Sequence, residues 1–298
     1  MHVITPRRSD LGDGFTVRRA LPNAAHRSVG PFVFLDRFGP VQLPPGTGLD
    51  VRPHPHIGLA TVSYLFEGAI AHRDSLGNDV TIRPGAVNWM TAGRGIVHSE
   101  RSPVELRADG PKLSGLQFWV ALPQALEACP PAFAHHGADE IPERVQDGAR
   151  IRVVLGEAFG MTSPVALTSP MFLVDVALEA GATVQLDGPF TERAVYVLEG
   201  EVVGEDPDVA TPAEHLIVYP PTTRLVLTAN NAPAHVVLLG GPPLDAPRFL
   251  WWNFVSTSRD RILEAQAAWS RQEFPKVPGE TEHIPLPSRP LPPEPTAL

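Results

Sequence analysis

Short apolar runs separated by glycine and proline recur along most of the chain. Each run has four to six residues, is rich in Val, Ile, Leu and Tyr, and in places alternates apolar with polar positions. Runs of this length, bounded by turn residues, predict the strands of a β-sandwich or barrel. The expected strands are residues 61–66, 116–120, 151–155, 172–176, 193–198, 215–219, 224–227 and 235–239.

Helical signals are few. Residues 122–128 predict a short helix with Pro123 in its first turn. A clearer helix begins near Ser258, a good N-cap residue, and runs through Trp269. The segment from Pro275 to Leu298 holds eight prolines, which exclude regular structure. We expect it to be an extended tail that lies on the surface or on a partner.

One internal repeat indicates the domain organisation. Residues 64–70, Tyr-Leu-Phe-Glu-Gly-Ala-Ile, resemble residues 196–202, which lie 132 positions later. Both segments predict a strand, a Glu-Gly turn and a second strand. A repeat of this period indicates two similar β domains rather than a solenoid. The sequence predicts an all-β fold with one domain at 1–135 and a second at 136–298, the latter including the helix and the tail.

Composition limits the environment and the partners. Hydrophobic residues make up 43% of the chain and charged residues 19%, which is typical of a globular protein. The net charge of −9 disfavours direct nucleic-acid binding. One cysteine cannot form an internal disulfide, and no apolar run approaches the ~18 residues of a membrane span. We expect a cytoplasmic protein without a membrane or nucleic-acid partner.

Two short motifs carry the strongest chemical signal: His54-Pro55-His56 and His98-Ser99-Glu100. Residues two apart in a strand face the same side, so each motif can direct both of its side chains to one point. Three imidazoles and a carboxylate suit Fe(II), Mn(II), Ni(II), Cu(II) or Zn(II). Because no cysteine accompanies them, a closed structural zinc site is disfavoured.

Other candidates are weaker. His135 and His136 stand among small and polar residues and are expected in a solvated loop. His72 follows the Glu-Gly turn and is expected at a strand edge. Cys129 lacks basic neighbours that would lower its pKa, so we expect an unreactive thiol.

Residues 58–68 and 89–100, together with the two histidine motifs, resemble the pirin family of the cupin superfamily. The resemblance is specific over residues 30–122 and weaker at 240–244 and 253–255. It implies a bicupin, with two double-stranded β-helix barrels and a metal in the N-terminal one. It also implies the ligands His54, His56, His98 and Glu100, and it directs Gln117 toward the metal pocket. In the second half the equivalent positions, 132 residues later, are Leu186, Gly188, Asn230 and Ala232, so we expect no metal there.

The same resemblance implies a quercetin 2,3-dioxygenase, which opens the central ring of a flavonol with O₂ and releases carbon monoxide. The implied cofactor is one divalent metal, Fe(II) before Mn, Ni, Cu or Zn, and the implied substrates are a small flavonol-like aromatic and O₂. The metal would polarise the deprotonated 3-hydroxyl oxygen, and Glu100 would accept its proton as the catalytic base. The alternative is an iron-dependent redox-sensing regulator that binds a protein partner. A sugar isomerase on the same barrel is disfavoured, because the sequence shows no phosphate clamp.

Overall fold

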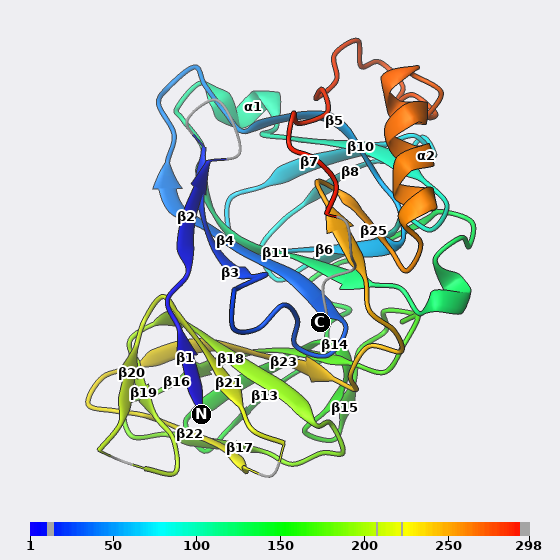
Figure 1. Cartoon of the computed structure of the whole chain (residues 1–298). Coiled ribbons are helices and arrows are strands. Elements are labelled where there is room, and N and C mark those ends of the chain that lie inside the picture. The colour runs from blue at the N-terminus through cyan, green and yellow to red at the C-terminus, as the bar shows by residue number, and fades with distance from the viewer. Residues whose placement is uncertain (11–14, 207, 222, 293–298) are drawn as a thin grey trace. The chain divides into compact units, whose positions relative to one another are not determined.

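The computed structural model describes residues 1–10, 15–206, 208–221 and 223–292, and it divides the chain into two compact units (Figure 1). One unit, which we call the histidine unit, comprises Ser9–Val17, Phe34–Ala138 and Leu244–Leu298. The other, which we call the apolar unit, comprises Met1–Arg8, Arg18–Val33 and Asp139–Pro243. Each unit consists almost wholly of strands, as the sequence predicts.

The two units do not follow the division into residues 1–135 and 136–298 that the sequence predicts. The internal break falls nearby, at Ala138, but the ends of the chain are exchanged between the units. The N-terminal strand β1 (His2–Ile4) pairs with β21 (His215–Tyr219) in the apolar unit. Residues from Leu244 onward belong to the histidine unit. There buried Arg248 and buried Glu127 form an ion pair, with Nε and Oε1 3.0 Å apart. Contacts between positions so distant in sequence leave no local signal.

Two sheets make up the apolar unit. The larger sheet has the order β1-β21-β18-β23-β16-β14-β13, with β15 paired to β14, and the smaller has the order β17-β22-β19-β20. Its further strands are β13 (Glu143–Gln146), β14 (Ala149–Ala158), β15 (Met161–Thr162), β16 (Phe172–Leu178), β17 (Thr183–Leu186), β18 (Glu192–Glu199), β19 (Glu201–Val203), β20 (Ala210–Pro212), β22 (Leu225–Ala229) and β23 (Ala234–Gly241).

The histidine unit has three sheets. One has the order β5-β10-β7-β8, another contains the run β12-β9-β6-β11-β4, and the third is the pair β24-β25. Strands β2 (Arg7–Asp10), β3 (Thr16–Leu21) and β4 (Phe32–Gln42) have residues in both units. The remaining strands are β5 (Asp50–His56), β6 (Leu59–Glu67), β7 (Ile70–Asp74), β8 (Asp79–Ile82), β9 (Val87–Thr91), β10 (Ile96–Arg101), β11 (Lys112–Ala121), β12 (Ala132–His136), β24 (Phe249–Trp251) and β25 (Phe254–Ser256).

The helices are short, and α2 lies in the C-terminal segment. Helix α2 (Arg259–Ser270) begins as predicted at Ser258, whose hydroxyl accepts a hydrogen bond from the Arg261 backbone N–H. It buries Ile262, Ala265 and Trp269 along one face. The helix expected at 122–128 is only a 3₁₀ turn, η1 (Gln124–Leu126), and α1 (Val104–Arg107) is a single turn. Within the described ranges, no helix is both long and apolar enough to cross a membrane.

The interior of the apolar unit is filled by hydrocarbon side chains. These side chains come from both sheets, and each of them is almost completely buried. Leu186, one of the positions equivalent to a ligand, belongs to this core. Asn230, another, donates from its amide to Glu201 at 2.7 Å. The two units therefore share an architecture and differ in what their strands direct inward.

The repeat noticed in the sequence corresponds to two equivalent turns. In the histidine unit, Gly68 lies between β6 and β7 with φ +86°; in the apolar unit, Gly200 lies between β18 and β19 with φ +74°. A side chain at either position would collide with a backbone carbonyl, that of Lys112 or Pro233 respectively. Both turns therefore require glycine, for its left-handed conformation and for the close approach of the neighbouring strand.

Replacing Gly68 tests this requirement. We expect Gly77→Ala to destabilise the protein by about 1 kcal/mol, because Gly77 has φ +91° but no described atom lies within 4 Å of its added methyl. We expect Gly68→Ala to lower the free energy of unfolding by about 1–3 kcal/mol more than Gly77→Ala does, because its methyl also collides with the Lys112 carbonyl. Urea unfolding of both variants measures the difference, and equal losses would contradict the close-approach argument.

Candidate metal centre

Strands β5 and β10 bring the predicted histidines together. They pair antiparallel, with His54 opposite His98 and His56 opposite Ile96, and their register shifts between His98 and Glu100. The period of two along each strand directs His54, His56 and His98 to the same side. All three residues are at least 93% buried.

The three imidazoles form one compact group. Each offers one nitrogen such that these atoms all lie within 4.8 Å of one another. The Nε2 atoms of His56 and His98 are 3.1 Å apart. Among the described residues this is the one group of three or more His, Cys, Asp or Glu side chains close enough to hold a metal ion.

Hydrogen bonds at the far side of two rings direct their Nε2 atoms inward. His54 Nδ1 lies 2.9 Å from the Arg52 carbonyl, and His56 Nδ1 lies 3.1 Å from the Asn253 carbonyl. A carbonyl oxygen can only accept, so each Nδ1 carries the proton and each Nε2 presents its lone pair. The Asn253 contact also shows that the C-terminal segment takes part in the site.

Burial keeps the imidazoles in the form that binds metals. Burial lowers the pKa of His54 to about 4, against a weaker opposing effect of its hydrogen bond to Arg52. Burial, followed by the neighbouring histidines, also lowers the pKa values of His56 and His98 well below the usual range. Neutral imidazole is the ligand form, so a first-row divalent cation fits this nitrogen donor set.

Glu100 lies beside the histidine group rather than within it. Burial raises its pKa, although His72 and a hydrogen bond from Ser63 oppose this effect. Ser63 Oγ lies 3.2 Å from Glu100 Oε1 and 2.8 Å from Gln117 Oε1. Ser63 therefore links the two residues that the sequence placed at the metal pocket. That Glu100 is a ligand and a base stays a prediction.

A polar row crosses the sheet that carries Ser63. His135, Asn88, Ser63 and Gln117 occupy directly paired positions on β12, β9, β6 and β11, so they share one face. His135 Nδ1 lies 2.7 Å from the Asn88 amide oxygen. The expectation that His135 and His136 occupy a solvated loop was therefore wrong: both belong to β12, because residues 132–136 pair with β9.

Aromatic rings lie against the histidine group. Trp119 meets His56 edge-on with ring centroids 5.3 Å apart, and its other neighbour, Phe34, is stacked on it at 4.0 Å. Trp119 comes from β11, two residues beyond Gln117, and shares its face. The site thus combines nitrogen donors, hydrogen-bonding groups and a planar aromatic surface.

His72 is not the edge residue that the sequence suggested. Strand β7 lies between β10 and β8, and His72 is 3% exposed, with its ring stacked on Phe133 at 4.4 Å. Its Nε2 lies 3.2 Å from Asp74, and its Nδ1 lies 3.4 Å from Nδ1 of His98. Burial opposes ionisation of Asp74, yet hydrogen bonds from His72 and Asn78 lower the pKa of this carboxyl.

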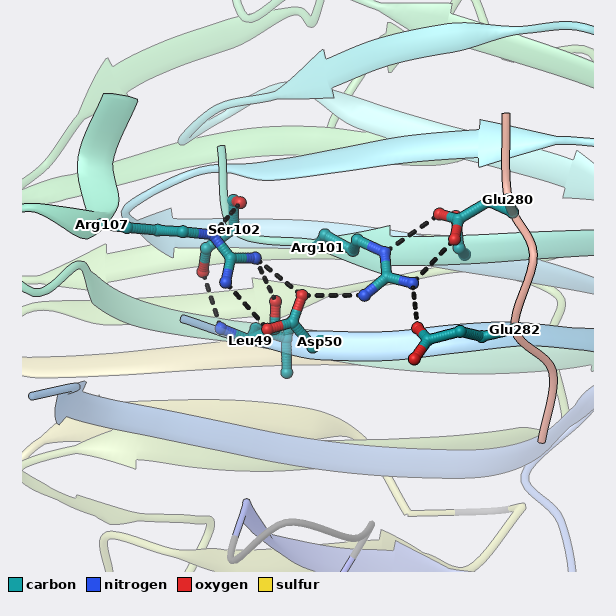
Figure 2. A network of polar contacts seen from close by, with 8 residues as sticks. Leu49, Asp50, Arg101, Ser102, Arg107, Glu280 and Glu282 are labelled. Atoms are coloured by element: carbon teal, nitrogen blue, oxygen red, sulfur yellow. Dashed lines mark hydrogen bonds and ion pairs between the residues drawn. The ribbon is translucent and has the colours of Figure 1, made fainter. Parts of the chain in front are cut away.

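The outer face of β10 is tied to the C-terminal tail (Figure 2). Arg101 donates from Nε and Nη2 to the two oxygens of Glu280, at 3.0 and 2.7 Å, and from Nη2 to Glu282 at 3.0 Å. Its Nη1 donates to Asp50 on β5 at 3.0 Å. The hydrogen bonds from Arg101 lower the pKa of Glu280. The described part of the tail therefore lies on the histidine unit, while residues 293–298 fall outside the described residues.

Sequence reasoning missed several residues around the site. Ser63 and Asn253 act through contacts that join distant parts of the chain, so nothing local identified them. His72-Arg73-Asp74 did carry a signal, because two polar residues in strand phase stand close to the metal motifs.

The buried histidines predict how stability depends on pH. His54 titrates near pH 4 when folded and near 6.5 when unfolded, so its stabilising contribution is complete above pH 6.5 and is lost as the pH falls toward 4. We expect this residue to contribute a slope of about 1 kcal/mol per pH unit between pH 6 and 5 in metal-free protein. Urea unfolding of wild type and His54→Asn measures it, and identical slopes would contradict the assignment.

Comparisons with known proteins identify the family of this chain. Residues 14–120 match the pirin family and residues 173–275 match the pirin C-terminal cupin domain. A pirin-like protein of Caulobacter vibrioides is 47% identical over 290 residues, covering 96% of this chain and 98% of its own. A solved quercetin 2,3-dioxygenase of Acinetobacter baumannii is similar at 33% identity and TM-score 0.88, covering 97% of this chain and 95% of its own. A second one has 28% identity and TM-score 0.85, with coverages of 92% and 97%. This chain belongs to the pirin family and contains two cupin domains.

Proposed function

We propose that the protein is a metal-dependent dioxygenase of the quercetin 2,3-dioxygenase type, with one metal ion in the histidine unit. The observation that carries the proposal is the convergence of three buried imidazoles within 4.8 Å. Similarity to the Acinetobacter baumannii quercetin 2,3-dioxygenases over nearly the whole chain supports the reaction type.

His54, His56 and His98 would hold the ion, and Glu100 would be the fourth ligand. Three neutral histidines and one carboxylate leave a divalent ion with one net positive charge. A six-coordinate ion would then retain two positions for exogenous ligands. Among such ions we propose Fe(II) as the cofactor, because the resemblance to pirins implies it. When bound, such an ion lowers the pKa of a coordinated hydroxyl and brings two reactants together.

The residues around the ion suit a flavonol. Trp119, stacked on Phe34, provides a planar surface for an aromatic ring system. The row of Gln117, Ser63, Asn88 and His135 provides hydrogen-bonding groups for its hydroxyls. These contacts would orient the 3-hydroxyl group toward Glu100.

Glu100 would accept the proton of that hydroxyl. An ionised carboxylate is an acceptor-only group, so Glu100 can take up that proton. The Ser63 hydroxyl has one proton to donate, and both Glu100 and Gln117 offer it an acceptor oxygen. Ser63 can therefore turn to Gln117 when Glu100 takes up the substrate proton.

Metal content tests the site. We expect about one metal per chain in wild type and a sharp fall in His56→Ala, because a ligand and its bond to Asn253 are lost together. His215→Ala is the matched control, since His215 belongs to the apolar unit and contacts the Ala213 carbonyl. Metal analysis after dialysis measures the occupancy, and unchanged metal in His56→Ala would exclude the site.

Turnover tests the role of Glu100. If Glu100 is the base, Glu100→Gln should keep part of the metal and lose roughly 10²-fold or more in turnover per bound metal. The control is Glu67→Gln, because Glu67 is a half-buried glutamate at the end of β6. Oxygen consumption and carbon monoxide release with a flavonol panel provide the measurement. Metal-loaded wild type that turns over no flavonol would contradict the dioxygenase and favour the regulatory alternative.

A further inference from the structure

The third metal-binding histidine differs from the other two in what holds its far nitrogen. His54 and His56 each donate from Nδ1 to a backbone carbonyl, which fixes their tautomers. His98 Nδ1 instead faces another imidazole, Nδ1 of His72, at 3.4 Å. An imidazole nitrogen can donate or accept, so this contact alone leaves the tautomer of His98 undetermined.

Asp74 removes the ambiguity. Its Oδ2 lies 3.2 Å from Nε2 of His72, and a carboxylate can only accept. A neutral His72 therefore carries its proton on Nε2, and its Nδ1 presents a lone pair to His98. His98 must then donate from Nδ1, which leaves its Nε2 lone pair free to point toward the imidazoles of His54 and His56.

The carboxylate itself is held firmly. Asp74 is fully buried, and its Oδ1 accepts from the backbone N–H groups of Leu76 and Asn78 at 2.9 and 3.1 Å. The Asn78 side chain donates to both carboxylate oxygens, at 3.1 and 2.8 Å. These contacts come from the tight loop between β7 and β8, so the loop fixes the acceptor that orients His72.

The ring of His72 is also fixed in orientation. It is buried and lies nearly parallel to Phe133, with an interplanar angle of 11°. Strand pairing places His98 opposite Asp74 across β10 and β7, next to the Glu100–His72 pair. The chain Asp74–His72–His98 is therefore held at each link by sheet register, ring stacking or loop hydrogen bonds.

We propose that His72 and Asp74 are positioning residues for the metal, acting as a two-step relay that sets the tautomer and ring orientation of His98. The inference rests on the metal site proposed above and goes beyond it, because neither residue belongs to the group of three histidines that would hold the ion. Outer hydrogen-bond partners of this kind typically contribute 10- to 100-fold in metal affinity.

Substitutions at His72 separate the relay from a packing role. His72→Phe preserves an aromatic ring against Phe133 but removes the acceptor for His98, so we expect affinity for Zn(II) or Ni(II) to fall 10- to 100-fold. In His72→Asn the amide oxygen replaces Nδ1 as the acceptor, so affinity should lie between wild type and His72→Phe. A role in packing alone predicts the reverse order, because Phe fills the buried site and Asn does not.

Asp74→Asn tests the second step. Its amide N–H would donate to His72 Nε2, move the His72 proton to Nδ1, and turn His98 into an acceptor with the proton on the wrong nitrogen. We expect the metal affinity of Asp74→Asn to fall by about as much as that of His72→Phe. Asp79→Asn is the control, because Asp79 lies on the same hairpin and pairs only with exposed Arg73 in the contacts observed. Unfolding of the metal-free variants monitors their stability.

Metal affinity by competition with a chelator is one measurement, and ¹⁵N NMR of histidine in the Zn(II)-loaded protein is the other. The relay predicts a slowly exchanging His98 Nδ1 proton with a scalar coupling across the hydrogen bond to His72 Nδ1. Absence of that proton, or wild-type affinity in His72→Phe, would overturn the relay alone. Wild type that binds no metal would instead overturn the proposed function. If Asp74→Asn does not fold, the two His72 variants and the NMR spectrum decide.

Discussion

Lone pairs of neutral imidazoles repel one another unless a cation lies between them. In this protein two Nδ1 protons are committed to carbonyls, so the Nε2 lone pairs of His54 and His56 must point into one buried space. His98 Nε2 approaches to 3.1 Å of His56. Protonating one ring would relieve the repulsion between the lone pairs. Burial disfavours this protonation, because it lowers the pKa values of all three histidines. The surrounding structure keeps the three imidazoles in place, and a bound cation would relieve the repulsion between their lone pairs.

Strand β10 connects the histidine group on its inner face with the C-terminal tail on its outer face. Of its inward residues, His98 belongs to the histidine group and Glu100 lies beside it. Its outward residues, Ser99 and Arg101, donate hydrogen bonds to Glu280. Figure 2 shows the contacts of Arg101. A one-residue slip would exchange the two sets, bringing a guanidinium into a group of imidazoles. The tail therefore helps to fix the phase of the strand. Because Asn253 also holds His56, the C-terminal segment completes the same site from a second direction.

The sequence was sufficient for what depends on local pattern. The period of two along 54–56 and 96–101 placed the three histidines on common faces, and all eight expected strands are present. It was not sufficient for contacts whose partners lie far apart in the chain. The sequence predicts Glu127 as part of a weak helix. In the structure it is buried, accepts hydrogen bonds from Ser256 and Thr257, and forms an ion pair with Arg248, all in the C-terminal segment. His135 reads as a loop residue because pairing with β9, not its own neighbourhood, makes it a strand.

The two Glu-Gly turns show which constraints are separable. Gly68 and Gly200 both adopt a positive φ beneath a neighbouring carbonyl, although their units differ in the polar side chains that they direct inward. One interior directs imidazoles and amides inward, and the other is packed with Val, Leu and Ile. Turn geometry depends on the backbone path, whereas chemistry depends on which side chains occupy alternate positions of the strands. Since these two sets of positions do not overlap, a strand pair can acquire or lose metal ligands while its turns stay unchanged. A Glu-Gly turn is therefore evidence of the fold, and only the inward positions of β5 and β10 are evidence of the function.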